Sequence, residues 1–149
     1  MTRNLLLALH IASVGAWLGA NFVQLVLLPR FNRESAAAAA LWARQTIFLG
    51  ERYYSIVGAL VGITGVLLVL DGDWSWSAGF VWVGIVVVLI GAALGVGAFS
   101  PLAKRRASAL ESGDASAAGS AQRRIIPLAL FDTALVLTAI LAMVDKWEA

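Results

Sequence analysis

The sequence contains no cysteine and little charge for its length of 149 residues. The lack of cysteine excludes disulfide bonds, thiolate metal sites and cysteine nucleophiles. Charged residues make up only 13% of the chain, about half of the share found in ordinary soluble domains. Histidine occurs once, as His10, and Met143 is the only methionine inside the chain. The side chains that usually build metal and redox centres are therefore scarce.

Apolar residues supply 60% of the chain, which is more apolar surface than a soluble core of this size can bury. They gather in four stretches, each close to or above the minimum length for crossing a bilayer as a helix. We therefore expect an all-α membrane protein with one transmembrane domain over residues 1–149, folded as a four-helix bundle. The predicted helices cover about 5–28, 53–70, 78–99 and 125–144, and the predicted cytoplasmic connections cover about 29–52 and 100–124.

Proline residues mark the expected ends of these helices. Pro29 with Arg30 ends the first apolar stretch, and Ser100 with Pro101 closes the third. Pro127 is expected in the first turn of the last helix, where a missing amide hydrogen does least harm. A cleavable signal peptide is the rival interpretation of the first stretch, but its apolar run is too long for one.

The basic residues indicate how the chain is oriented. Positively charged side chains are retained on the cytoplasmic side of a membrane. Nine of the eleven Lys and Arg residues lie in the two long connections, namely Arg30, Arg33, Arg44, Arg52, Lys104, Arg105, Arg106, Arg123 and Arg124. Both termini are therefore predicted on the non-cytoplasmic side. Nucleic acid is not expected as a partner, because the basic residues flank apolar stretches.

Aromatic residues fall where interfacial belts are expected. Trp74, Trp76 and Trp147 are predicted at the non-cytoplasmic interface, and Tyr53 with Tyr54 at the cytoplasmic one.

Glycine pairs with small-xxx-small spacing occur in three of the four stretches. Such spacing lets helix backbones approach closely in a membrane. It predicts a compact bundle, or a bundle that binds a partner. The pairs are Gly15 with Gly19, Gly58 with Gly62, and Gly91 with Gly95.

Polar residues of the first stretch share one helical face. At 100° per residue they fall within a sector of about 80°. These residues are His10, Ser13, Trp17, Asn21 and Gln24. Because Gly15 and Gly19 fall on the opposite face, the first helix is predicted to be packed on two sides.

Asp132 is the strongest candidate partner for this polar face, since an aspartate in a membrane helix is costly. Asp132 and Asn21 both lie about 10 Å inside the cytoplasmic boundary, whereas His10 lies about 7 Å inside the opposite one. We therefore expect two polar centres, an outer one at His10 and an inner one at Asn21, Gln24 and Asp132.

Each centre has a structural and a functional interpretation. His10 is either a neutral imidazole bonded to a carbonyl or water, a metal or haem ligand, or a proton relay. Asp132 either makes a structural hydrogen bond to Asn21 or Gln24, or forms a proton or cation site. Glu51 and Arg52 are expected to form an interfacial ion pair.

Two segments resemble a known family. The stretch LHIASVGAWLGANF, which contains His10 and Trp17, is similar to the opening helix of copper-resistance-protein-D-like membrane proteins and of related small, uncharacterised bacterial proteins. The segment FDTALVLTAILAMVDKW resembles the last helix of that small group. The resemblance implies a multi-pass protein of the bacterial cytoplasmic membrane with a link to copper or haem.

The ligand content departs from that pattern. Copper sites need clustered His, Met or Cys ligands, so neither a metal nor another cofactor is expected here. A haem held by two histidines would need His10 from a second chain.

Three functions follow from these observations. The leading hypothesis is a non-enzymatic accessory or partner-binding subunit in a homo-oligomer or a larger membrane assembly. The alternatives are a haem- or copper-linked redox protein that uses His10 and a small proton-coupled carrier that uses Asp132.

Overall fold

The computed structural model describes residues 2–72 and 74–146, which form helices and short turns without a strand. The first long helix is α1 (Thr2–Glu34). The second is continuous through α2 (Ala36–Phe48), the π-helical η1 (Leu49–Tyr54) and α3 (Ser55–Asp71). The third comprises α4 (Gly79–Leu94), the π-helical η2 (Gly95–Phe99) and α5 (Ser100–Glu111). The fourth is α6 (Ala115–Asp145). The predicted all-helical fold is thus confirmed for the described residues.

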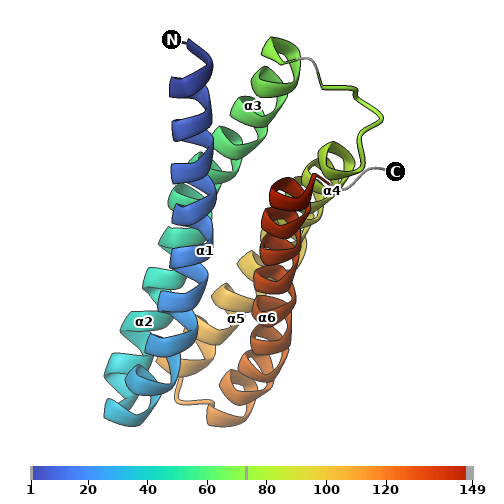
Figure 1. Ribbon diagram of the computed structural model, residues 1–149. Helices are drawn as coiled ribbons and strands as arrows, with labels where there is room; N and C mark the ends of the chain where they lie inside the picture. The colour runs from blue at the N-terminus through green and yellow to red at the C-terminus, as the bar shows by residue number, and fades with distance from the viewer. Residues whose placement is uncertain (1, 73, 147–149) are drawn as a thin grey trace.

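The four long helices form two hairpins that pack side by side. In Figure 1, α1 pairs with the helix that ends in α3, and α6 pairs with the helix that begins with α4. The start of α1 and the end of α6 lie at the same end of the bundle, which we call the terminal end, and the tight turns at 35 and 112–114 lie at the other, the turn end. In both views the hairpins are closer together at the turn end.

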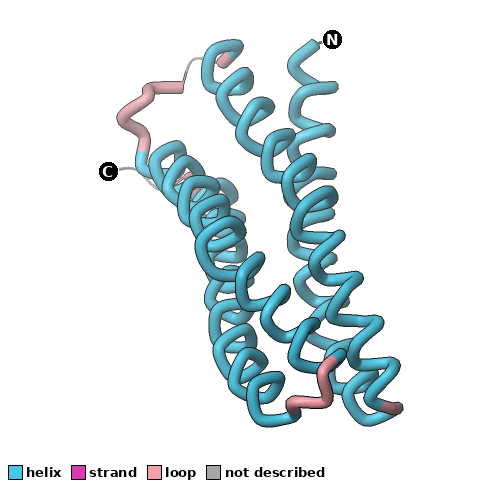
Figure 2. The backbone as a smooth tube through the Cα atoms, turned by 180° about the vertical axis from the view of Figure 1, so that it is seen from behind, coloured by secondary structure: helices cyan, strands magenta, loops and turns pink. Residues whose placement is uncertain are grey.

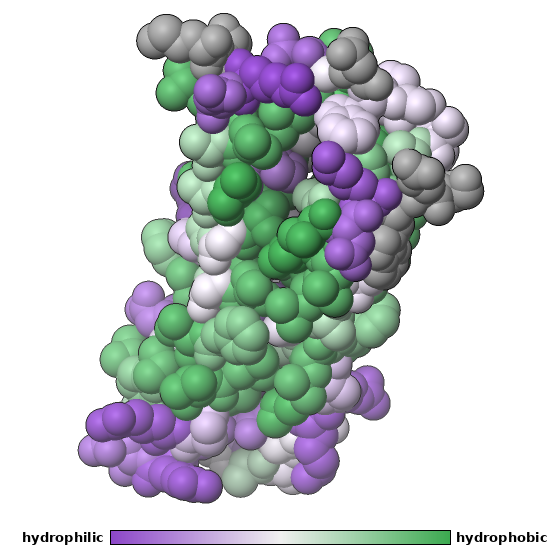
Figure 3. Space-filling view, in the orientation of Figure 1, coloured by the Kyte–Doolittle hydropathy of each residue, from purple (hydrophilic) through white to green (hydrophobic). Residues whose placement is uncertain are grey.

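The surface between these ends is apolar. Figure 3 shows a broad hydrophobic band between hydrophilic ends. Large apolar side chains of the long helices are exposed, for example Ile11 and Val26 of α1 and Val144 of α6. All four long helices are long and apolar enough to cross a membrane. The architecture therefore fits a multi-pass membrane protein with its lipid-facing side chains turned outward.

The helices run further than the prolines predict. α1 continues through Pro29 to Glu34, and the third helix continues through Ser100 and Pro101. Pro127 lies deep inside α6, so its predicted place in a first turn is wrong. A proline inside a helix loses one backbone hydrogen bond, and contacts made beyond it offset that loss. After Pro29, for example, Phe31 stacks on Trp42 of α2 with ring centroids 4.8 Å apart.

Local capping defines the two turns. The Ser35 side chain accepts a hydrogen bond from the amide of Ala38 at 3.0 Å and starts α2. Asp114 accepts one from the amide of Ala117 at 2.9 Å and starts α6. Between α5 and α6, Gly113 has a φ of 76°, a conformation that glycine adopts without steric cost.

Two ion pairs join α5 to the second helix near the turn end. Arg44 lies 2.7 Å from Glu111, and Lys104 lies 2.8 Å from Glu51. The predicted pair of Glu51 with Arg52 is therefore wrong, because Glu51 pairs across the bundle. All four side chains are about half exposed, so these pairs contribute little to stability.

The aromatic residues predicted at the two interfaces differ in their surroundings. Trp74 lies in the α3–α4 loop, with the Lys146 ammonium 5.1 Å from its ring centroid, and Trp76 in the same loop is exposed. Trp147 lies outside the described residues. Tyr53 and Tyr54 pack against the core, and their placement at the cytoplasmic interface stays a prediction.

Candidate functional site

Asp132 lies at the centre of the bundle and is 6% exposed. Its Oδ2 accepts a hydrogen bond from Nδ2 of Asn21 at 2.8 Å and another from Nε1 of Trp17 at 3.1 Å. Both donors belong to α1, one helical turn apart, so α1 presents them side by side. The first and the last long helix are thereby joined through one carboxylate oxygen.

A chain of hydrogen bonds extends from Asn21 toward α3. The Tyr54 hydroxyl donates to Oδ1 of Asn21 at 2.7 Å, and Nε2 of Gln24 donates to the Tyr54 oxygen at 2.6 Å. Every donor in this chain points toward Asp132. Bonds aligned in one direction polarise each other, so the chain strengthens the hydrogen bond that Asn21 donates to the carboxylate. We call Trp17, Asn21, Gln24, Tyr54 and Asp132 the central network.

The π-helical segment η1 places the tyrosines of this site. A π-helix carries an extra residue per turn and is frequent at functional sites. From η1, Tyr54 reaches Asn21, while the Tyr53 hydroxyl donates to the Ala16 carbonyl at 3.0 Å. Two adjacent residues of the second helix therefore both bond to α1.

No basic side chain balances Asp132 among the residues that the structure describes. The ion pairs there are those of Arg44 with Glu111 and of Lys104 with Glu51, both at the surface. The partners of Asp132 are instead neutral N–H groups. A buried carboxylate held only by neutral donors can bind a proton or a small cation without first breaking an ion pair.

Glycine makes room for the Trp17 ring beside Asp132. A Cβ atom on Gly91 of α4 would lie 2.6 Å from two carbons of the Trp17 ring and 3.6 Å from Oδ1 of Asp132. The indole thus fills the space above Gly91. Gly58 of α3 faces the same ring, with a Cβ position 3.9 Å away. Two of the predicted glycine contacts therefore accommodate a single side chain.

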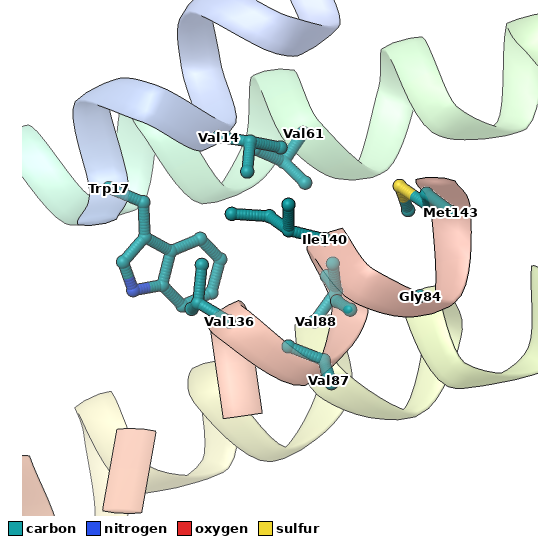
Figure 4. A pocket seen from close by; sticks show the side chains of 10 residues that line it. Val14, Trp17, Val61, Gly84, Val87, Val88, Val136, Ile140 and Met143 are labelled. Carbon is teal, nitrogen blue, oxygen red and sulfur yellow. The ribbon is translucent and has the colours of Figure 1, made fainter. Parts of the chain in front are cut away.

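A small cavity borders Trp17 on the side of the terminal end. It has a volume of about 30 Å³, enough for about two water molecules. Figure 4 shows its lining side chains, which come from α1, α3, α4 and α6 and include Val14, Val61 and Met143. The lining is apolar, and an organic solute does not fit into it.

His10 forms a separate centre nearer the terminal end. Its Nδ1 lies 2.9 Å from the Thr64 hydroxyl oxygen. That hydroxyl donates to the carbonyl of Leu60, one turn earlier in α3, so the histidine nitrogen is the donor in this pair. The other ring nitrogen, Nε2, therefore carries the lone pair in this arrangement.

The structure brings Asn21 and Asp132 into direct contact and connects Gln24 to them through Tyr54. His10 is not part of this network. Three contributions were missed from the sequence, namely the Trp17 indole as a donor, Tyr54 as the link and Thr64 as the partner of His10. The position of Trp17 on the polar face of α1 was a signal for the first. A tyrosine close to the start of an apolar stretch gave no sign that it points inward.

No metal-binding cluster of three or more His, Cys, Asp or Glu residues occurs in the described part of the chain. No family model, curated protein or solved structure matches the chain. The resemblance to copper-resistance-protein-D-like proteins thus stays a prediction.

Proposed function

We propose that this chain is a small, non-enzymatic carrier of the bacterial cytoplasmic membrane that is coupled to protons through Asp132. The observation that carries the proposal is a buried carboxylate whose partners among the described residues are neutral N–H donors from Trp17 and Asn21. The basic residues at the turn end favour an orientation in which this end faces the cytoplasm. Both termini then lie on the opposite side.

The directed hydrogen bonds of the central network support a proton site at Asp132. They place four N–H and O–H donors on one side of the carboxylate. No ion pair with a described basic side chain has to break when the carboxylate binds a proton. Intramembrane aspartates with such surroundings serve as proton sites in transporters.

The size of the interior favours the proton as the bound species. The cavity beside Trp17 measures about 30 Å³ and is apolar, so an organic substrate needs another conformation of the bundle. A proton needs only the carboxylate and transient water. Coupling would then consist of a change in helix packing when the Asp132 carboxylate is protonated to a neutral carboxylic acid.

The test is to measure protons directly on the full chain reconstituted into liposomes. Infrared difference spectra recorded after a pH jump should contain a carboxyl band that Asp132→Asn removes. An imposed pH gradient should decay faster than in protein-free liposomes, and Asp132→Asn should return the decay to the protein-free rate.

Asp71→Asn is the matched control, because Asp71 is an exposed carboxylate at the end of α3. This variant should leave both signals unchanged. A gradient decay that is the same in wild type and Asp132→Asn would refute the proposal.

A partner-binding role is the second candidate, and the outward glycines of α1 favour it. Gly15 and Gly19 have no atom within 4 Å of the position that a Cβ would take. They lie on the outer face of the bundle, free for a close helix contact with a second copy or another subunit. This role and the proton site use opposite faces of α1 and are compatible.

The haem- or copper-linked alternative depends on Nε2 of His10, which carries the lone pair when Nδ1 donates to Thr64. One nitrogen is not a complete site, so further ligands would have to come from another chain. An absorption spectrum and metal analysis of the purified protein test it. A Soret band or bound copper that disappears in His10→Ala would support this alternative.

A further inference from the structure

Arg106 is another ionisable side chain that is buried in the bundle interior. It is 3% exposed, although arginine is almost never fully buried without a charged partner. Its Nη2 donates to Oδ1 of Asn32 at 2.6 Å, and Nδ2 of Asn32 donates to Oε1 of Gln122 at 2.8 Å. Its Nε has no hydrogen-bond partner in the described structure. We call Arg106, Asn32 and Gln122 the arginine layer.

Arg106 forms no ion pair with any carboxylate in the part of the chain that the structure describes. The acidic residues of α5 and the second helix at this end, Glu111 and Glu51, are paired with Arg44 and Lys104 at the surface. Asn32 and Gln122 are neutral. The field of a buried cation is screened much less than that of an exposed one, so the layer repels other cations that approach it.

The arginine layer lies between Asp132 and the turn end. Gln122 and Asp132 are ten residues apart on α6, which places the layer about 15 Å from the carboxylate along the helix axis. On α1, Asn32 and Asn21 are separated by a similar length. The same two helices thus carry the central network and, nearer the turn end, the layer.

The opposite side of Asp132 is organised differently. The cavity beside Trp17 begins there and runs between Val14 of α1 and Met143 of α6. Both lining residues lie nearer the terminal end than Asn21 and Asp132. Besides Asp132 itself, the central network contains one titratable side chain, Tyr54. Trp17, Asn21 and Gly91, which also face the carboxylate, do not titrate. His10 and Thr64 lie further out along the same side.

From this asymmetry we propose that Asp132 exchanges protons only with the terminal end, past Trp17, because the arginine layer closes the turn end to cations. A single positive side chain in a narrow pathway excludes protons and cations in other membrane pores. This inference rests on the proposed function, since it assigns a side of access to the same carboxylate.

A one-sided pH jump tests the inference. Because the chain has no cysteine, Ser112→Cys in the α5–α6 turn gives a unique thiol, and a membrane-impermeant reagent then reports which end of the bundle faces outward. In liposomes of uniform orientation, the infrared band of Asp132 should respond to pH on the side of the terminal end. It should not respond to pH on the side of the turn end.

Arg106→Met removes the charge but keeps a long side chain, and it should let the band respond from both sides. Arg105→Met is the matched control, because Arg105 is the exposed neighbour in α5, and it should leave the response one-sided. Arg106→Lys keeps the charge and should also stay one-sided.

The outcomes separate the two proposals. A wild-type band that responds from the turn end, or equally from both sides, overturns the inference while leaving Asp132 as a proton site. An Arg106→Met band that stays one-sided in a folded protein also overturns it. If no Asp132 band responds to pH on either side, the proposed function itself fails. The wild-type measurement decides the side of access even if Arg106→Met does not fold.

Discussion

The indole nitrogen of Trp17 lies 3.1 Å from Oδ2 of Asp132, and this hydrogen bond joins the first and the last long helix across 115 positions of the sequence. The same indole ring lies above Gly91 of α4 and borders the cavity. Trp17 therefore separates the carboxylate from the space beside it. Mutations can therefore test separately the hydrogen bond from Trp17 to Asp132 and the packing of the Trp17 ring beside the cavity.

Trp17→Phe should lower the free energy of unfolding by about 1–2 kcal/mol, because Oδ2 of Asp132 then keeps only the donor from Asn21. Unfolding in a denaturing detergent, followed by circular dichroism, measures the change. Trp82→Phe is the control, since Trp82 is 56% exposed on α4, and it should change stability by less than about 0.5 kcal/mol. Equal losses in both variants would show that the indole N–H contributes nothing specific.

Gly91→Ala should destabilise the bundle by about 1–3 kcal/mol, the usual cost of overpacking. The added Cβ would lie 2.6 Å from the Trp17 ring and force it to move. Gly95→Ala serves as the comparison, because nothing lies within 4 Å of its Cβ position. It should be neutral or stabilising, by up to about 1 kcal/mol from helix propensity. Equal stability of the two variants would mean that Trp17 does not pack against Gly91.

Tyr54→Phe should be energetically coupled to Asp132→Asn, because Asn21 connects the two side chains. A double-mutant cycle should give a coupling energy of at least about 0.5 kcal/mol. The neighbouring hydroxyl of Tyr53 bonds to the Ala16 carbonyl instead. The changes in the free energy of unfolding caused by Tyr53→Phe and by Asp132→Asn should therefore be additive to within about 0.5 kcal/mol. Additive effects in both cycles would contradict a continuous network.

Gly15→Ile should weaken self-association without changing the fold of a single chain, since its side chain would project from the outer face of α1. Energy transfer between labelled chains in liposomes measures the association. Gly97→Ile, in η2, is a control in similarly open surroundings and should leave the signal unchanged. A wild-type chain that shows no energy transfer would remove the support for association between copies through this face.

The four long helices were predictable because lipid-facing surfaces need long apolar stretches, and composition alone reveals those stretches. The ends of these helices were not predictable from the sequence. Pro29 was expected to end α1, but Phe31 and Asn32 beyond it make contacts with α2, α5 and α6 that continue the helix. Contacts between residues far apart in sequence leave no local sign. The orientation of the termini relative to a membrane stays a prediction.

The candidate site was predictable in part, for a similar reason. The contact between Asn21 and Asp132 was predictable because both residues lie at the same depth along their helices, and depth follows from the helical rise alone. Tyr54 was assigned to an interface because tyrosines are common there. The π-helical turn of η1, which is not visible in the sequence, accompanies its inward position. The partners of Arg106 come from α1 and α6 and depend on how the two hairpins pack.

The contact of Trp17 and Asn21 with Asp132 also has a consequence for biosynthesis. The donors leave the ribosome in the first helix, and the acceptor leaves it in the last. Until α6 is inserted, α1 exposes two polar groups that have no carboxylate to bind, and a chain cut short before α6 keeps them exposed. Completion of the central network thus depends on the insertion of α6, whose Asp132 is synthesised after both donors.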